Sequence, residues 1–262
     1  MNAVSGTAVL APEADLERRL GGLRRLYGDA AYTRVRTAHV AVVGVGGVGS
    51  WAAEALARSG VAALTLIDLD QVSESNVNRQ VQALGSTIGM AKVEALRLRI
   101  GDIHPGCAVE TVEEFVDETN WPSLLARHAD AVIDACDNVR AKAVMAAWAR
   151  ATATPLVVVG AAGGKRAAER VEVGDLADVT HDPMLAALRQ RLRKFNDAPR
   201  NGAIGVSCVF SRESVSGPVS DESSATDGSL NCHGYGSSVA VTATFGMVAA
   251  ARALEGVIAR GR

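Results

Sequence analysis

Aromatic residues are scarce in this chain of 262 residues, and Phe, Trp and Tyr together make up only 4% of it. So few rings leave little material for an extended surface that stacks nucleotide bases. Neither sign of charge is in large excess, and the formal net charge of −2 excludes a generally basic coat for nucleic acid. Any RNA partner would therefore have to bind a local basic patch.

Cysteine is scarce too, and its spacing excludes further classes of protein. The residues lie far apart and form no C-x-x-C pair; they are Cys107, Cys136, Cys208 and Cys232. This spacing argues against a zinc ribbon and against a disulfide framework. The N-terminus also lacks the charged-then-apolar layout of a signal peptide. We therefore expect a cytoplasmic protein whose thiols stay reduced.

One largely apolar segment, residues 239–258, is nearly long enough to cross a bilayer. Polar residues interrupt it, and two of them, Arg252 and Glu255, would place charges within the lipid. Since that would be costly, we predict a buried or interface helix and no membrane partner.

Alternating apolar segments of strand length and helix length fill the region from residue 40 to residue 160. The pattern predicts strands at 40–44, 63–68, 108–112, 130–134 and 155–160, and helices at 48–59, 89–101, 119–127 and 138–151. This order predicts an α/β fold with a doubly wound, Rossmann-like, mostly parallel sheet and helices on both faces. In such a fold the ligand binds at the carboxyl ends of the strands.

The segments on either side of this region complete the expected organisation. Residues 1–36 are predicted to form an N-terminal helical arm with a break at Gly21-Gly22, and residues 37–165 to form the Rossmann core. Residues 166–262 would be a C-terminal extension within the same structural domain. We expect in it a strand at 171–173, a helix at 183–194, a mobile, serine-rich loop at 211–231 and a long final helix.

A glycine-rich turn directly follows the first predicted strand. Its glycines are Gly44, Gly46, Gly47 and Gly49, and a predicted helix comes next. Such a turn lets backbone N–H groups and the positive end of the helix face a phosphate, with glycine where a Cβ would block the approach. We predict that these glycines bind the phosphates of a nucleotide.

Two carboxylates, Asp68 and Asp70, come at the end of the second predicted strand. Asp68 stands where many nucleotide-binding proteins have a carboxylate that accepts hydrogen bonds from a ribose hydroxyl. The alternative is that Asp68 caps a loop or a helix. Because NAD enzymes and ATP enzymes both bind ribose in this way, Asp68 does not decide between them.

Polar residues after the second strand favour ATP. Hydride transfer needs no cations beyond the glycine loop, whereas attack on the α-phosphate of ATP requires charge to be neutralised on the departing pyrophosphate. Arg79 and Lys92 fit that requirement as catalytic residues, Asn76 could hold ribose or a phosphate oxygen, and Gln80 could orient its neighbours. Singly, each is as well explained as a solvated surface group or a loop hydrogen bond. Together they indicate ATP.

These motifs resemble the ATP-binding core of the E1-like ThiF/MoeB superfamily of adenylating enzymes. The matching runs are G-x-G-G-V-G at 44–49, I-D-L-D at 67–70, N-x-N-R-Q at 76–80, G-x-x-K at 89–92 and D-x-x-D-N at 134–138. The resemblance implies that ATP is contacted by Asp68, Asp70, Asn76, Arg79, Gln80, Lys92 and Asn138. It also implies that Asp137 acts in catalysis by helping to place Mg²⁺.

In this superfamily an arginine of the partner subunit commonly reaches the phosphates, so the resemblance implies a homodimer. Arg19 and Arg25 are the candidates for that arginine, although the usual R-x-x-R spacing is absent.

Further stretches extend the resemblance toward the branch of the superfamily that dehydrates N6-threonylcarbamoyladenosine at position 37 of tRNA. They lie at 25–28, 49–58, 163–164, 182–183, 206–211 and 241–246. The implied reaction is adenylation of the threonyl carboxylate by ATP, followed by ring closure from within the same side group. Two alternatives stay open: an activator of a ubiquitin-like sulfur carrier, and a Rossmann protein that binds no ATP, either a nicotinamide dehydrogenase or a nucleotide sensor.

Cys232 is the one cysteine for which the resemblance implies chemistry. It neighbours His233 and matches a family cysteine suspected in sulfur relay or thioester chemistry. A cysteine desulfurase or sulfur acceptor would then be a partner. The alternative is a half-buried small thiol without a chemical role.

A local excess of positive charge offers the best place for tRNA. The interval 189–200 has five cations and one acid, Asp197, and two more cations lie near residue 165. A solvated helix face would explain this equally well. The candidates for binding the phosphates of the anticodon stem are Lys165, Arg166, Arg189, Arg191, Arg193, Lys194 and Arg200.

Overall fold

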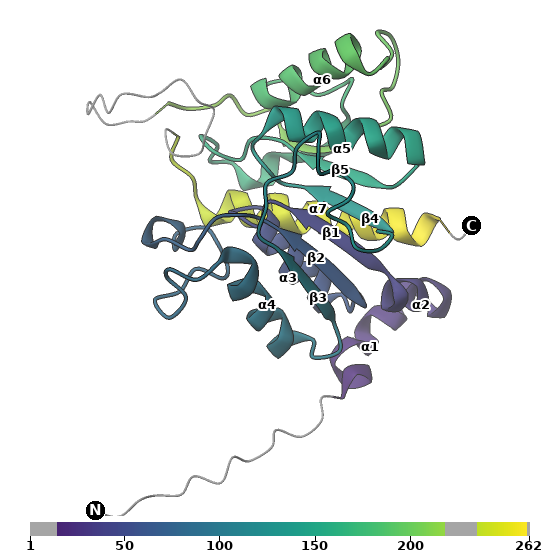
Figure 1. Cartoon of the computed structure of the whole chain (residues 1–262), viewed down its shortest axis with the longest axis vertical. Coiled ribbons are helices and arrows are strands. Elements are labelled where there is room, and N and C mark those ends of the chain that lie inside the picture. The colour runs from purple at the N-terminus through teal and green to yellow at the C-terminus, as the bar shows by residue number, and fades with distance from the viewer. Residues whose placement is uncertain (1–14, 218–234, 261–262) are drawn as a thin grey trace, which may run out of the picture.

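A seven-stranded sheet spans the molecule (Figure 1). The computed structural model describes residues 15–217 and 235–260. The strands are β1 (His39–Val43), β2 (Ala63–Ile67), β3 (Ala108–Val112), β4 (Ala131–Asp134), β5 (Leu156–Val159), β6 (Val171–Asp175) and β7 (Ser207–Ser211). Their order across the sheet is β3-β2-β1-β4-β5-β7-β6, and every neighbouring pair is parallel except β6 and β7. The predicted α/β fold with a mostly parallel sheet is confirmed.

Helices cover both faces of this sheet. They are α1 (Leu16–Tyr27), α2 (Asp29–Thr37), α3 (Gly49–Arg58), α4 (Lys92–Ile103), α5 (Val139–Thr152), α6 (Pro183–Phe195) and α7 (Val239–Ala259). Side chains of β1 alternate between two buried clusters, one shared with α3, α4 and α7 and the other with α5 and α6. Because both faces are covered, β1 is apolar throughout, as expected for a strand in the middle of a parallel sheet.

The C-terminal helix α7 lies against α3 and crosses the sheet at β4 and β5 (Figure 1). Gly246 permits the contact with α3, since a Cβ there would lie 2.5 Å from the carbonyl oxygen of Val48. α7 is long and apolar enough to pass for a membrane span, but half of its most apolar window is buried inside the protein. It is thus the buried helix that the sequence predicts.

Two helix predictions are wrong. No helix forms at 119–127, because Asp117 Oδ1 accepts the backbone N–H groups of Thr119 and Asn120 and so stabilises turns instead. The break at Gly21-Gly22 is absent as well: α1 runs through both glycines to Tyr27 and is capped by Gly28, whose φ of +80° suits glycine.

Strand β7 was not predicted, and it separates β5 from β6 in the sheet. It lies just before the expected mobile loop and overlaps it only at Ser211. After it, residues 212–217 run beside Gly164, where the Ser216 N–H donates to the Gly164 carbonyl at 2.8 Å. Residues 218–234 of that loop, with Cys232, lie outside the described residues.

Candidate functional site

The glycine loop between β1 and α3 depends on two close backbone approaches. A Cβ on Gly49 would lie 1.8 Å from the carbonyl oxygen of Gly44. Gly44 has a φ of +80°, and a Cβ there would lie 2.8 Å from the backbone nitrogen of Cys136, just after β4. Within the described chain, no side chain caps the start of α3. Apart from the Ser50 N–H, which donates to the Gly46 carbonyl at 3.1 Å, the N–H groups of its first turn are therefore available to an anion.

The segment at 76–80 lies directly over this loop. A Cβ on Gly47 would meet Arg79 Cδ at 3.4 Å, and one on Gly46 would meet Gln80 Nε2 at 3.9 Å. The segment is tied down because Trp51 Nε1 on α3 donates to the Arg79 carbonyl at 3.0 Å. The sequence did not point to Trp51, since its partner is 28 residues away and no local pattern signals the contact.

Asp68 holds the glycine loop from the side of β2. Its Oδ2 accepts the Val45 N–H at 2.8 Å, its Oδ1 accepts the Asp70 N–H at 3.0 Å, and the residue is only 7% exposed. Burial raises the pKa of this carboxyl above its ordinary value, against the opposing effect of the nearby Lys92 charge and of both N–H groups. Carboxylate oxygens have further lone pairs, so Asp68 can also accept from a ligand hydroxyl.

Lys92 is the first residue of α4, where the helix dipole disfavours a cation. Two carboxylates stabilise it there: Nζ lies 2.6 Å from Asp70 Oδ2 and 3.9 Å from Asp68 Oδ1. The side chain is nearly buried, so its ammonium group is fixed beside Asp68, the residue predicted to bind ribose. An ammonium group has three donors, and one strong partner leaves capacity for a phosphate oxygen.

Arg79 and Asn76 keep their positions through contacts within their own loop. Arg79 donates to the Ser75 carbonyl at 2.7 Å and to Asn78 Oδ1 at 2.9 Å. Asn76 is 7% exposed, and its Oδ1 accepts the Ser73 N–H at 3.1 Å in a capping box. A guanidinium has five donors, so Arg79 can bind a phosphate above the glycine loop without losing these contacts.

Asp137 is exposed on the loop between β4 and α5, and the structure leaves its carboxylate accessible to a ligand. Asn138 has a structural task, because its Oδ1 accepts the N–H groups of Arg140 and Ala141 as the N-cap of α5. The described residues contain no cluster of three or more metal-ligating side chains. A single carboxylate nevertheless fits Mg²⁺, which is commonly held by one or two carboxylates together with substrate phosphates.

A buried ion pair supports this loop from below. Lys142 Nζ lies 3.0 Å from Asp134 Oδ1 at the end of β4 and donates to the Val159 carbonyl at the end of β5 at 2.9 Å. Cys136 Sγ donates to the same carboxylate at 3.1 Å, and burial raises the pKa of this thiol well above its usual value. Cys136 is therefore a neutral, half-buried thiol that packs against the core. The sequence did not single out Lys142.

The predicted tRNA cations fall into two groups. Lys165, Arg189 and Arg193 point inward and donate to backbone carbonyls: Lys165 to Ser211 and Glu213, Arg189 to Leu176 and Val179, and Arg193 to Pro199 and Arg200. The prediction of a phosphate contact needs correction for Lys165, which is 2% exposed. Arg189 and Arg193 are half-buried, and the protein occupies part of their donors. The cations whose side chains make no hydrogen bond or ion pair in the described residues, each at least partly exposed, are Arg166, Arg191, Lys194 and Arg200.

The two candidates for an arginine in trans lie far from the glycine loop of their own chain. Arg19 donates to the carbonyls of Asp102 and Ile103 at the end of α4, the end opposite Lys92. With a helical rise of 1.5 Å per residue, α4 separates them by roughly 17 Å. Arg25 is exposed on α1. Neither can act on its own subunit's glycine loop from this position.

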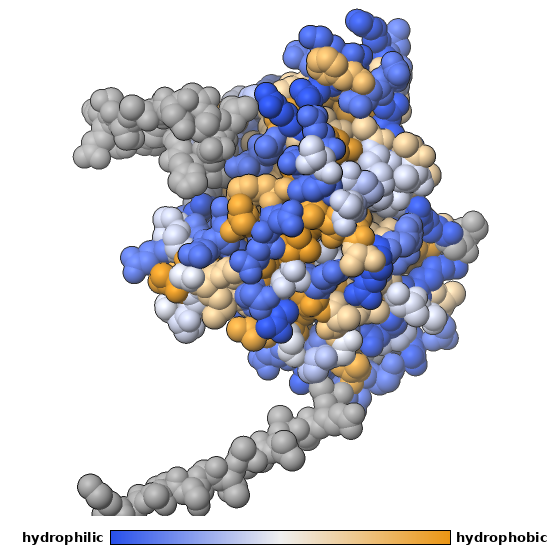
Figure 2. All heavy atoms as spheres, in the orientation of Figure 1, coloured by the Kyte–Doolittle hydropathy of each residue, from blue (hydrophilic) through white to orange (hydrophobic). Residues whose placement is uncertain are grey.

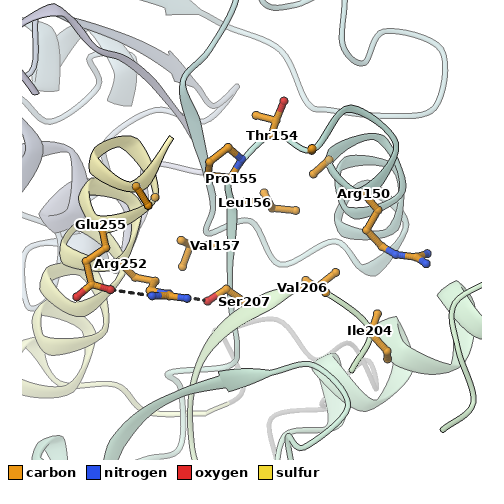
Figure 3. A pocket seen from close by; sticks show the side chains of 15 residues that line it. Arg150, Thr154, Pro155, Leu156, Val157, Ile204, Val206, Ser207, Arg252 and Glu255 are labelled. Atoms are coloured by element: carbon orange, nitrogen blue, oxygen red, sulfur yellow. Dashed lines mark hydrogen bonds and ion pairs between the residues drawn. The ribbon is translucent and has the colours of Figure 1, made fainter. Parts of the chain in front are cut away.

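A groove of about 520 Å³ lies at the opposite edge of the sheet, beside the amino ends of β5 and β7 (Figure 3). Arg252 of α7 points across it and donates to Ser207 Oγ and to Glu255 (Figure 3). None of the predicted site residues lines this groove. The candidate site is therefore identified by the hydrogen-bond donors at the carboxyl ends of the strands, and not by the size of a cavity.

Comparison with known proteins agrees with the motifs. The model of the ThiF family matches residues 17–259. The chain belongs to the ThiF family. This ThiF-family chain is 44% identical over 253 residues to the tRNA threonylcarbamoyladenosine dehydratase of Escherichia coli K12, covering 93% of this chain and 94% of that protein. The protein of the same name from Haemophilus influenzae is 39% identical, with 95% and 97% covered.

Solved structures agree as well. The crystal structure of the E. coli dehydratase TcdA in complex with ATP has a TM-score of 0.86 to this ThiF-family protein at 42% identity, covering 96% of this chain and 98% of that one. Another crystal structure of that enzyme contains AMP, with the same TM-score of 0.86. The likeness extends over almost all of both chains, so it includes the extension after residue 165.

Proposed function

We propose that this protein is an ATP-dependent dehydratase that converts N6-threonylcarbamoyladenosine at position 37 of tRNA to its cyclic form. One observation carries the proposal: Arg79 lies over the glycine loop while Lys92 is fixed beside Asp68 at the end of β2. Two cations around a phosphate cradle suit nucleotidyl transfer. The names of the relatives, and the ATP and AMP in two of their structures, support the same reading.

The nucleotide would bind across the carboxyl ends of β1, β2 and β4. The loop of Gly44, Gly46, Gly47 and Gly49 and the uncapped start of α3 would hold phosphates. Asp68 would accept from the ribose, with Asn76 and Gln80 nearby. Arg79 and Lys92 would bind the oxygens of the departing pyrophosphate and stabilise the charge that develops there.

Asp137 would hold Mg²⁺ together with phosphate oxygens of the nucleotide. The ion would supply additional positive charge to the triphosphate when bound. Asn138 would contribute by fixing the start of α5, and hence the backbone on which Asp137 stands.

The chemistry makes a poor leaving group into a good one. An oxygen of the threonyl carboxylate attacks the α-phosphorus of ATP, the bond to the β-phosphate oxygen breaks, and pyrophosphate leaves. A nucleophile of the same side group then attacks the carboxyl carbon, closes a five-membered ring and expels AMP, which carries away the former carboxylate oxygen, while the nucleophile loses its proton to the solvent. The net change in the nucleoside is the loss of water. Because the nucleophile is intramolecular, proximity supplies much of the acceleration.

We further propose the setting in which this site works. Residues 1–36 would form the arm of a homodimer and could present Arg19 or Arg25 to the partner's phosphates, residues 37–165 the nucleotide core, and residues 166–262 the part that meets tRNA. The protein would act in the cytoplasm without a membrane partner. Cys232 is the candidate contact to a cysteine desulfurase or sulfur acceptor.

Mass spectrometry of nucleosides at position 37 tests the proposal directly. After incubation of threonylcarbamoylated tRNA with the protein and Mg-ATP, that nucleoside should be lighter by the mass of one water molecule. Omitting ATP is the control. If turnover of ATP depends instead on a small protein with a Gly-Gly tail, the protein is a sulfur-carrier activator. Binding of NAD(H) in preference to ATP would also overturn the proposal.

A further inference from the structure

The C-terminal end of α6 presents an aromatic ring to solvent beside two cations. Phe195 is 60% exposed. The Arg191 guanidinium carbon lies 5.3 Å from the centroid of its ring, and Lys194 Nζ lies 4.9 Å from it. We call these three residues the α6 cluster. In a chain with so few aromatic residues, a ring exposed to this extent among cations is unusual and points to a ligand.

The cluster stands on a rigid base. Leu188 and Leu192 bury the inner face of α6. Two arginines fix the chain that follows the helix: Arg193 donates to the carbonyls of Pro199 and Arg200, and Arg150 of α5 donates to that of Asn196. Because these contacts hold the helix end, little ordering is required when a ligand binds to the outer face.

The outer cations keep their charge for a ligand. In the described part of the chain, the side chains of Arg191, Lys194 and Arg200 have no ion pair, and those of Arg191 and Lys194 lie against the Phe195 ring. The one acid in the interval 189–200 is Asp197. Figure 2 shows hydrophilic side chains gathered at the top of the molecule, over α6, with a smaller hydrophobic area among them.

We propose that Phe195 stacks on an unpaired base of the bound tRNA while Arg191 and Lys194 bind the phosphates beside it. The inference rests on the proposed function, which supplies the RNA. An RNA strand offers both groups that the cluster matches, an aromatic base face and a chain of phosphates. One ring is enough for a single base, although the chain has too few for an extended stacking surface.

The position of the cluster separates its role from the chemistry. The N-cap of α6 is Asp182, whose Oδ2 accepts the Ala161 N–H beside the carboxyl end of β5. Its 13 residues carry the cluster roughly 20 Å from that edge. Phe195 therefore contacts a nucleotide other than the one being modified. Its loss should raise the Kd and the KM for tRNA and leave kcat unchanged.

Phe115 provides a matched control. It is also 60% exposed, but its neighbours in the sequence are the acids Glu113 and Glu114, whereas Phe195 has cations nearby. The experiment is filter binding of threonylcarbamoylated tRNA to the full-length protein. We expect Phe195→Ala to raise the Kd about tenfold, Phe195→Tyr to bind like the wild type, and Phe115→Ala to change nothing.

Salt dependence distinguishes stacking from charge. Phe195→Ala should leave the slope of log Kd against log salt unchanged, whereas Lys194→Ala should reduce it by about one phosphate contact. The inference is overturned if Phe195→Ala binds tRNA as tightly as Phe115→Ala does, or if Phe195→Ala alters only the oligomeric state, which would make the cluster a protein contact. The wild-type protein is assayed for cyclisation of the nucleoside in the same series. If it is active, such a result overturns the inference about Phe195 but not the proposed function.

Discussion

Lys142 Nζ lies 3.0 Å from Asp134 Oδ1, and neither side chain is exposed to solvent. The same ammonium group donates to the carbonyl of Val159, so the pair joins the ends of β4 and β5 directly beneath the loop of Asp137. Asp134 Oδ2 is buried and has no hydrogen-bond partner in the described residues. Burial opposes both charges, so each partner depends on the other to remain ionised in the core.

Lys142→Met should therefore lower the free energy of unfolding by about 3–5 kcal/mol, because it leaves the Asp134 carboxylate buried without its cation. Urea unfolding followed by circular dichroism measures the loss. In the double variant Asp134→Leu with Lys142→Met, no charge remains, and we expect a much smaller loss. Equal losses in the single and the double variant would show that packing of the lysine chain, and not the pairing of charges, supports these strand ends.

The two cations of the candidate site make a second prediction. Arg79→Ala and Lys92→Ala should each reduce ATP-dependent turnover at least about 100-fold, the size expected for losing a group that stabilises developing charge. Lys92→Ala also removes the nearest cation from Asp68, so the KM for ATP should rise as well. Circular dichroism should show a native fold in both variants.

Arg97→Ala is the matched control for Lys92→Ala. Arg97 lies on the same helix α4, where it pairs with Glu94 at the surface. Such an exposed pair contributes little, so both turnover and stability should stay near wild type. Wild-type turnover of Arg79→Ala and Lys92→Ala would remove both residues from the site.

The sheet and the glycine loop could be predicted because their signals are local. A strand that is apolar throughout and a turn such as 44–49 are visible within ten residues. The contact between Trp51 and the Arg79 carbonyl joins positions far apart in sequence, and nothing near either position signals it. Lys142 was overlooked for the same reason, since a lysine on an amphipathic helix is ordinarily a surface residue.

Errors arose where side chains compete with the backbone pattern. At 119–127 the spacing of apolar residues suits a helix, but the Asp117 carboxylate captures two backbone N–H groups and favours turns. The basic interval 189–200 shows the converse problem. A count of charges cannot show that the guanidinium groups of Arg189 and Arg193 already donate to carbonyl groups of the protein.

Glycine substitutions give a third prediction, which tests the role of the glycine loop in ATP binding separately from the stability of the fold. Gly49→Ala should abolish ATP binding, because its Cβ would lie 1.8 Å from the Gly44 carbonyl oxygen and the loop could not keep its shape. Isothermal titration with Mg-ATP measures this. Gly101→Ala, inside α4 with no atom within 4 Å of the new Cβ, should bind ATP normally and gain about 0.5–1 kcal/mol of stability. ATP binding by Gly49→Ala would show that the loop is not the cradle.

The last prediction concerns pH and His104, which is buried at the end of α4. Arg36 lies with its guanidinium nitrogen 3.0 Å from His104 Nε2. Because a guanidinium can only donate, Nε2 must accept and cannot carry a proton. Burial, and then the charges of Arg36 and Arg19, lower the pKa of His104 in the folded protein.

In the unfolded chain, His104 therefore takes up a proton near the ordinary histidine pKa of about 6.5. In the folded protein it stays unprotonated at that pH. The free energy of unfolding should fall as the pH is lowered from 7.5 to 5.5, by at most about 1.4 kcal/mol per pH unit for this residue. His39 contributes in the same direction, because burial lowers its pKa as well. In His104→Gln the amide oxygen can still accept from Arg36 but does not titrate, so the slope measured by urea unfolding should become shallower. An unchanged slope would mean that His104 is protonated, and hence differently arranged, in the folded protein.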